Sequence, residues 1–173
     1  MEQKERLESE SPGSKLLLAV RIRGTRGDNP STQLTLKSLG LEAKFNARLV
    51  PSNPDMLGML RRAKDIVTWG ELDQDTLTLI LAKRAEKSGP GTHKLDQDFT
   101  KLQFRLGSIN DLAAGIMAGN VELDRLSKAG VKTTIRLHPP KGGFKKSTRR
   151  PYNSNGELGY RGRDINRLAR RMV

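Results

Sequence analysis

Three short segments of the sequence, residues 16–24, 43–50 and 131–138, alternate between apolar side chains and Lys, Arg, Asn or His. A period of two residues is that of a β-strand, in which successive side chains point to opposite faces of a sheet. Helices are the expected cover for the apolar face. The opposite face is expected to be open, flat and basic. Acidic residues are absent from its outward positions, which favours a binding surface over a merely solvated one.

Helix signals lie between the strands of residues 15–72. Pro30 and Pro54 stand where a first helical turn accepts proline, and the first helix is expected to stop at Gly40. A further strand is expected near residues 65–72. The resulting order is β-α-β-α-β, and helices on one face of the sheet make it a two-layer sandwich, which we class as α+β.

Three regions flank this core. Residues 1–14 are polar and are expected to form a disordered tail. Residues 73–130 carry eight basic and eight acidic side chains and are expected to be a neutral helical region, with Asp73 as its first helix cap. Residues 131–173 are expected to hold a fourth strand, an extended basic arm and a final helix capped by Asp164.

The formal charge of the chain is +13, and it is unevenly placed, because residues 131–173 hold twelve basic and two acidic side chains. A concentration of one sign indicates a docking face for an acidic partner. Nucleic acid and anionic membrane are the two large polyanions available. If half of the twelve cations met phosphates, about six contacts would form, and binding would weaken by about 10³ between 50 and 200 mM salt.

Residues 137–163 are rich in Gly, Pro, Lys and Arg and contain one acidic residue, Glu157. Ordering a residue costs about 1–2 kcal/mol of backbone entropy, and this segment has little apolar surface to offset that cost. We therefore expect it to become ordered against a polyanion. Phe144, Tyr152 and Tyr160 lie among the cations, where stacking of a base on each ring would contribute about 1–3 kcal/mol. A disordered tail that only aids solubility is the alternative.

Several classes of function are disfavoured. The chain has no Cys and only two His, too few ligands for an evident metal site. It also lacks the Gly-rich phosphate-binding motif of P-loop enzymes. The first residues show no apolar signal region, and no run of apolar residues is long enough to span a membrane. We expect a soluble cytosolic protein that is not an enzyme and binds no cofactor or small-molecule substrate.

Three stretches resemble a known family: LLLAVRIRG (16–24), AKFNARLVPSNPDMLGMLRRAKDIVTWGELD (43–73) and TIRLHPPKGGF (134–144). Together they resemble the large-subunit ribosomal proteins whose bacterial member is called L-thirty and whose eukaryotic member is called L-seven. Bacterial members resemble only residues 15–72, and the remainder looks like the longer archaeal form. The resemblance implies a small, largely antiparallel, ferredoxin-like sheet with two helices on one face. It also implies a structural role on the cytoplasmic ribosome, without catalysis.

The partners that the resemblance implies are large-subunit rRNA, in the neighbourhood of 5S rRNA, and adjacent ribosomal proteins. Carried over by position, the implied rRNA contacts are Arg21, Arg23, Lys44, Asn46, Arg48, Trp69, Arg136 and His138. The basic pattern of the chain adds Arg26, Lys132, Lys141, Phe144, Lys145, Lys146, Arg149, Arg150, Tyr152, Tyr160, Arg161 and Arg163. For Trp69 a place in the core is an equal alternative. A free basic protein that binds nucleic acid or anionic membrane through its tail is the alternative function.

Overall fold

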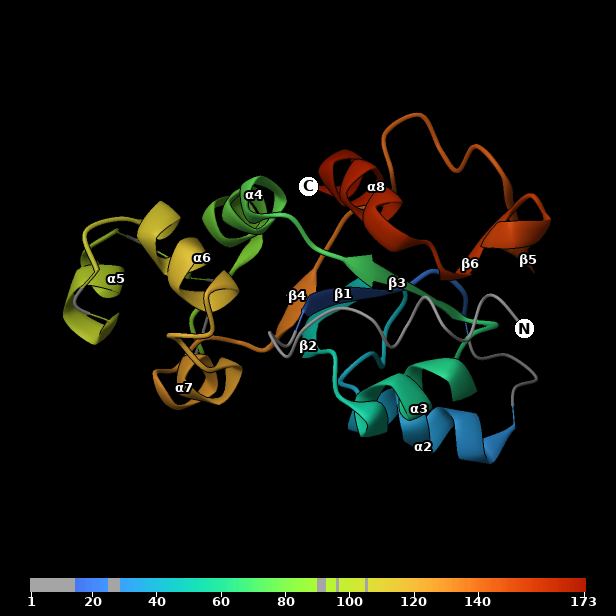
Figure 1. The fold of residues 1–173 in the computed structure, drawn as a ribbon, viewed down its shortest axis with the longest axis horizontal. Helices are drawn as coiled ribbons and strands as arrows, with labels where there is room; N and C mark the ends of the chain where they lie inside the picture. The colour runs from blue at the N-terminus through green and yellow to red at the C-terminus, as the bar shows by residue number, and fades with distance from the viewer. Residues whose placement is uncertain (1–14, 25–28, 90–92, 96, 105) are drawn as a thin grey trace.

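The computed structural model describes residues 15–24, 29–89, 93–95, 97–104 and 106–173. The predicted N-terminal tail and Arg26 lie outside the described residues. A six-stranded sheet of order β4-β2-β1-β3-β6-β5 forms the centre of the described fold, and helices lie on both sides of it (Figure 1). No helix in the described ranges is long and apolar enough to cross a membrane.

The sheet is antiparallel through its first four strands. The strands are β1 (Leu16–Arg21), β2 (Asn46–Pro51), β3 (Val67–Glu71), β4 (Thr134–Arg136), β5 (Ser147–Pro151) and β6 (Gly156–Tyr160). Strand β1 is central and pairs antiparallel with β2 and β3, while β4 pairs antiparallel with β2. Strand β6 runs parallel to both β3 and β5. The predicted α+β class with a largely antiparallel sheet is confirmed.

The helices follow the predicted order as far as α4. They are α2 (Pro30–Ser38), α3 (Pro54–Arg62), α4 (Gln74–Arg84), α5 (Gln97–Phe104), α6 (Ile109–Met117), α7 (Leu123–Lys128) and α8 (Ile165–Met172), with 3-10 turns η1 (Tyr152–Ser154) and η2 (Gly162–Asp164). The predicted cap at Asp73 is confirmed, because its Oδ1 accepts a hydrogen bond from the Thr76 amide at 2.7 Å. Helix α8 begins after Asp164, but the Asp164 carboxylate makes no capping bond and accepts one from Tyr152 instead.

Apolar clusters lie on both faces of the sheet. On one face Leu17 and Ala19 of β1 pack in a cluster with residues of α2 and α3. On the other face Leu18 and Val20 pack in a cluster with residues of α4, α6 and α8. The expectation of an open basic face is therefore wrong for the middle of the sheet. Helices α2 and α3 cover the face that carries Leu17, Ala19 and Arg21, which was expected to be open, while elements after residue 72 cover the fully apolar face.

The expectation of an extended arm is also wrong for residues 147–163, which add two strands to the sheet. The edge of β3 supplies the partners: Thr68 Oγ1 donates to the Gly159 carbonyl, and the Arg161 amide donates to the Trp69 carbonyl, both at 2.9 Å. These bonds offset part of the backbone entropy without a polyanion. A Cβ on Gly156 would lie 1.8 Å from the Arg150 carbonyl oxygen, so glycine lets β5 and β6 approach.

Candidate nucleic-acid interface

Three of the predicted RNA contacts are buried. The guanidinium of Arg21 donates from Nη1 to the carbonyls of Leu41, at 2.9 Å, and Glu42. Trp69 is 5% exposed and belongs to the cluster that includes α2 and α3 residues. Arg161 is 7% exposed. These side chains hold the fold together and are not part of the surface that a nucleic acid can reach.

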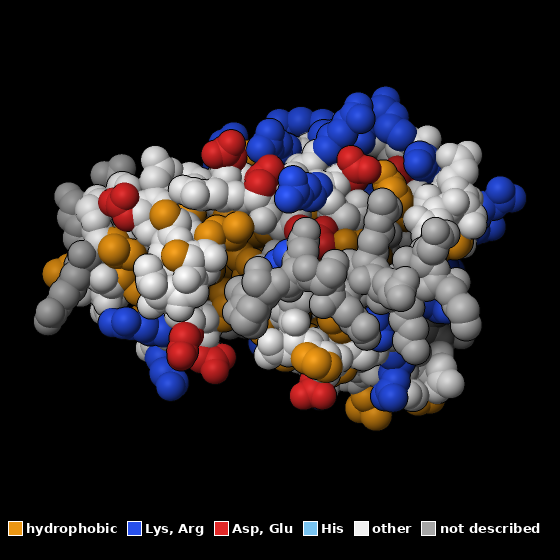
Figure 2. Space-filling model, in the orientation of Figure 1, with side chains coloured by type: hydrophobic (Ala, Val, Ile, Leu, Met, Phe, Trp, Pro, Cys, Tyr) orange, Lys and Arg blue, Asp and Glu red, His pale blue; other side chains and the backbone are white. Residues whose placement is uncertain are grey.

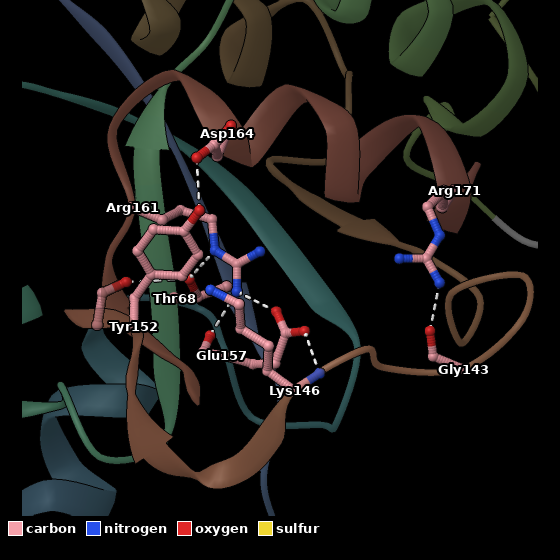
Figure 3. A network of polar contacts seen from close by, with 9 residues as sticks. Thr68, Gly143, Lys146, Tyr152, Glu157, Arg161, Asp164 and Arg171 are labelled. Carbon is pink, nitrogen blue, oxygen red and sulfur yellow. Dashed lines mark hydrogen bonds and ion pairs between the residues drawn. The ribbon is translucent and has the colours of Figure 1, made fainter. Parts of the chain in front are cut away.

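Arg161 is held by a network of polar contacts (Figure 3). Its Nη2 lies 2.6 Å from Glu157 Oε2, and its Nε donates to Thr68 Oγ1 at 2.8 Å. The other carboxylate oxygen of Glu157 accepts from the Lys146 amide at 3.1 Å. Glu157, the single acidic residue of the 137–163 segment, therefore ties β6 to Arg161 and Lys146. Within the described residues it does not pair with the exposed cations of the surface.

Two of the three predicted stacking rings are occupied within the protein. Phe144 stacks on Phe45, with ring centroids 6.4 Å apart. The ring of Tyr152 contacts two cations, with its centre 4.6 Å from Lys146 Nζ and 4.9 Å from Arg161 Cζ. Its hydroxyl donates to Asp164, and this hydrogen bond, with burial, raises the pKa of Tyr152. A base that stacked on the contacted face of either ring would have to displace these contacts.

Tyr160 is the exposed member of the three, with 47% of its surface accessible. Its hydroxyl donates to Glu71 Oε1, which ties β6 to the end of β3. Burial of the hydroxyl, and then the contact with Glu71, raises the pKa of Tyr160 from 10.0 to about 12. The residue is therefore still partly accessible to a partner.

The predicted RNA contacts on or next to β1 and β2 are only partly exposed. Arg23 and Arg48 are half-buried and donate to backbone carbonyls, those of Asp65 at 3.1 Å and Ser38 at 3.2 Å. Asn46 is half-buried as well. These side chains lie on the side of the sheet that α2 and α3 cover. They therefore form a rim around the covered area rather than the flat, open face that was expected.

Lys44 and Lys132 have partners in the protein. The ammonium of Lys44, on an exposed side chain, lies 4.8 Å from the ring centre of Phe45. Lys132 forms an ion pair of 2.9 Å with Glu86. Ion pairing lowers the charge that Lys132 can present to a partner.

A group of exposed cations lies along the chain that follows β4. Figure 2 shows Lys and Arg side chains gathered along the upper edge of the molecule, over α8 and the segment between β4 and β5. We define the C-terminal basic surface by its exposed members: Lys141, Lys145, Lys146, Arg149, Arg150, Arg163 and Arg167. In the described part of the chain none of these seven side chains forms an ion pair. Phosphate groups are bound by cations spaced along a surface in this way.

Helix α8 fixes the course of the loop that carries part of this surface. Arg171 donates to the backbone carbonyls of Lys141, at 2.8 Å, and Gly143 (Figure 3). The amide of Lys141 returns a hydrogen bond to the Arg171 carbonyl at 2.9 Å. The loop is thereby preorganised against the helix, which lowers the entropic cost of binding a partner.

Comparison with known proteins gives two kinds of match. The sequence profile described as Ribosomal protein L30p/L7e matches residues 17–67. Large ribosomal subunit protein uL30 of Staphylothermus marinus is 43% identical over 161 residues, which are 91% of this chain and 98% of that protein. The uL30 of Hyperthermus butylicus is 43% identical over 167 residues, covering 92% of this chain and 91% of that one. The uL30 of Ignicoccus hospitalis is 41% identical over 160 residues, 92% and 98% of the two chains.

The chain belongs to the uL30 family.

The profile match covers β1 through the start of β3, whereas the archaeal uL30 relatives align over nearly the whole chain. Helices α4 to α8 and strands β4 to β6 therefore lie outside the profile match. The similarity to the uL30 relatives extends beyond the profile into this part of the chain. The predicted resemblance to the longer form of the family is confirmed.

One cation of the C-terminal basic surface was absent from the predicted contacts. Arg167 is exposed on α8, on the side opposite the buried Ile165 and Leu168. Its position opposite an apolar stripe is the signal that identifies it. Arg170 lies on the same helix but pairs with Asp73 at 3.1 Å.

Proposed function

We propose that this uL30 family member is a structural component of the large ribosomal subunit and binds rRNA through its C-terminal basic surface. Of the twelve Lys and Arg residues in 131–173, three form ion pairs with acidic side chains, and the described residues provide no such partner for the other nine. This uncompensated charge, on a chain 43% identical to a named large-subunit protein, is the observation that supports the proposal. The protein acts by binding, not by catalysis.

An anionic membrane is the less suitable polyanion. A membrane-surface helix inserts large apolar side chains between lipids. In α8 the apolar residues Ile165, Leu168 and Met172 are at most 3% exposed, because they pack into the core. The helix therefore exposes cations but no large apolar side chains to solvent. This favours a partner that is bound through its phosphate groups over a membrane into which apolar side chains must insert.

Two finer points are part of the proposal. The protein sits near 5S rRNA, and adjacent ribosomal proteins contact the neutral helical region. Chemical cross-linking of purified large subunits, followed by identification of the linked peptides and RNA fragments, tests both.

The main experiment removes charge from the C-terminal basic surface. The variant K145Q/R149Q/R150Q/R163Q loses four exposed cations, and the control K37Q/R61Q/R62Q/K64Q loses four exposed cations near α2 and α3. Filter binding to large-subunit rRNA is measured between 50 and 400 mM salt. Because each lost phosphate contact lowers the log–log salt slope by about 0.9, the first variant should lose about 3–4 units of slope.

The control should keep the slope of the unmodified chain, and sucrose gradients of a native lysate should place the unmodified chain with the large subunit. An equal loss of slope in both variants would assign the binding to net charge rather than to this surface. Recovery of the unmodified chain mainly in the light fractions would contradict the ribosomal role.

A further inference from the structure

A second cationic site lies apart from the C-terminal basic surface, at the end of α4. A pocket of about 340 Å³ is lined by cations from three separate segments: Lys83 and Arg84 of α4, Lys94, and Arg136 of β4, with His138 beside them. Lys83 and Arg84 stand in the last turn of their helix, where the helix dipole favours cations in any case. Lys94, Arg136 and His138 have no such reason to gather there.

The positive charge of this pocket is not balanced from within. Among the described residues of its lining Glu86 is the acidic one, and its carboxylate is already paired with Lys132 at 2.9 Å. None of the four pocket cations forms an ion pair with another described residue. Like charges that share a concave site repel one another, and the walls focus their potential. An anion from outside would relieve that repulsion.

Arg84 is fixed in the wall of the pocket. Its Nη2 donates to the main-chain oxygen of Val173, the last residue of the sequence, at 2.7 Å, while its Nε is buried with no acceptor among the described residues. The guanidinium is thus held in place with incomplete hydrogen bonding. The positive charge of the pocket excludes a metal cation as its occupant.

We propose that this pocket binds a phosphodiester group of an RNA strand, as a contact separate from the C-terminal basic surface. The proposal rests on the proposed function and adds a second RNA-binding site to it. The pocket is larger than one phosphate group requires, so it also admits the ribose beside the phosphate. His138 then stands where its ring nitrogens can hydrogen-bond to a 2′-hydroxyl, a group by which proteins distinguish RNA from DNA.

The test uses the full chain, the variant K94Q/R136Q and the matched control R61Q/K64Q, which also loses one Arg and one Lys from exposed positions. Filter binding to large-subunit rRNA is measured across salt concentrations, and circular dichroism checks that each variant is folded. Loss of one phosphate contact lowers the log–log salt slope by about one. We expect that loss for K94Q/R136Q and the unmodified slope for R61Q/K64Q.

A second measurement locates the contact. The ring signals of His138, one of two histidines in the chain, are followed by NMR during addition of a uridine hexanucleotide, uridine or ATP. The hexanucleotide should move these signals in the unmodified chain and leave them unchanged in K94Q/R136Q, and uridine should have no effect. A response to ATP alone would mark a site for free nucleotides and overturn the assignment.

Failure of the pocket and failure of the proposed function give different results. If K94Q/R136Q bound rRNA with the unmodified slope, the pocket assignment would be wrong while rRNA binding stood. If the unmodified chain itself did not bind rRNA, the proposed function would fail first.

Discussion

Glu157 and Arg161 form an ion pair of 2.6 Å in which the two side chains are only 6% and 4% exposed. The pair joins β6 to the residue that follows it, and Arg161 continues the contact to Thr68 of β3. A buried cation without its partner is costly, because the interior solvates it poorly. The attachment of β6 therefore depends on both members of the pair.

Removal of one member should destabilise the whole protein. For Glu157→Ala we expect the free energy of unfolding to fall by about 3–5 kcal/mol, since Arg161 is left buried and unpaired. Urea unfolding followed by circular dichroism measures the change. The control Glu42→Ala removes an exposed carboxylate and should change stability by less than about 0.5 kcal/mol.

Replacement of both members provides a further check. The double variant E157L/R161M has no buried charge to leave unpaired, so it should be more stable than Glu157→Ala. If the two variants were equally unstable, packing of the aliphatic side chains rather than the ion pair would control the attachment of β6.

Two glycines should respond in opposite ways to the same substitution. A Cβ on Gly70 would lie 1.9 Å from the Gly162 carbonyl oxygen, so Gly70→Ala must push η2 away from β3. We expect a loss of about 3 kcal/mol or more, at the upper end of overpacking effects. A Cβ on Gly58, within α3, meets nothing within 4 Å, so Gly58→Ala should gain about 0.5–1 kcal/mol. Thermal unfolding compares the two, and equal shifts would refute the close approach of η2.

The titration of Tyr160 should report its contact with Glu71. The pKa of Tyr160 is raised from 10.0 to about 12, first by burial and then by the hydrogen bond to Glu71. Because the pKa in the folded state lies above that of the unfolded state, the contact stabilises the fold below pH 10. That contribution is lost as the pH rises through about 12.

The measurement uses Tyr152→Phe, which leaves Tyr160 as the single tyrosine, and follows phenolate absorbance against pH. The midpoint should lie near pH 12, and adding Glu71→Gln should lower it while burial keeps it above the ordinary value of 10.0. A midpoint near 10.0 in Tyr152→Phe alone would show that the hydroxyl is neither buried nor held by Glu71.

The elements of residues 15–72 were predictable because local signals agree there. The alternation of residues 16–24 marks β1, and Pro30 and Pro54 mark the first turns of α2 and α3. That both faces of the sheet are buried was not predictable in the same way. A period of two separates the faces of a strand, but it does not show that α2 and α3 cover the face that carries Arg21 while α4 and α8 cover the fully apolar one.

Arg21 illustrates the consequence for the candidate site. It alternates with apolar neighbours and so fits a basic open face, yet its guanidinium is enclosed and binds the Leu41 and Glu42 carbonyls. A buried arginine that donates to backbone carbonyls after a helix leaves no periodic signal in the sequence. Charge reversal of Arg21 would therefore test the fold and not RNA binding.

The composition of residues 137–163 indicated surface charge correctly but not the two strands. Lys145, Arg149 and Arg150 are exposed as expected. The segment nevertheless folds on β3, because Glu157 neutralises the one cation that becomes buried and Gly156 permits close strand contact. Pairings between residues about 90 positions apart, such as Thr68 with Gly159, have no local signature.

The insertion of β6 between β3 and β5 has a consequence for biosynthesis. Residues 156–173 supply both the strand that pairs with β3 and the helix that covers one side of the core. Until they emerge from the exit tunnel, the nascent chain carries an unpaired strand edge beside uncovered apolar side chains. Closure of the domain is therefore a late step that follows the synthesis of β6 and α8. A product truncated before residue 156 is the form that chaperones and proteases should recognise.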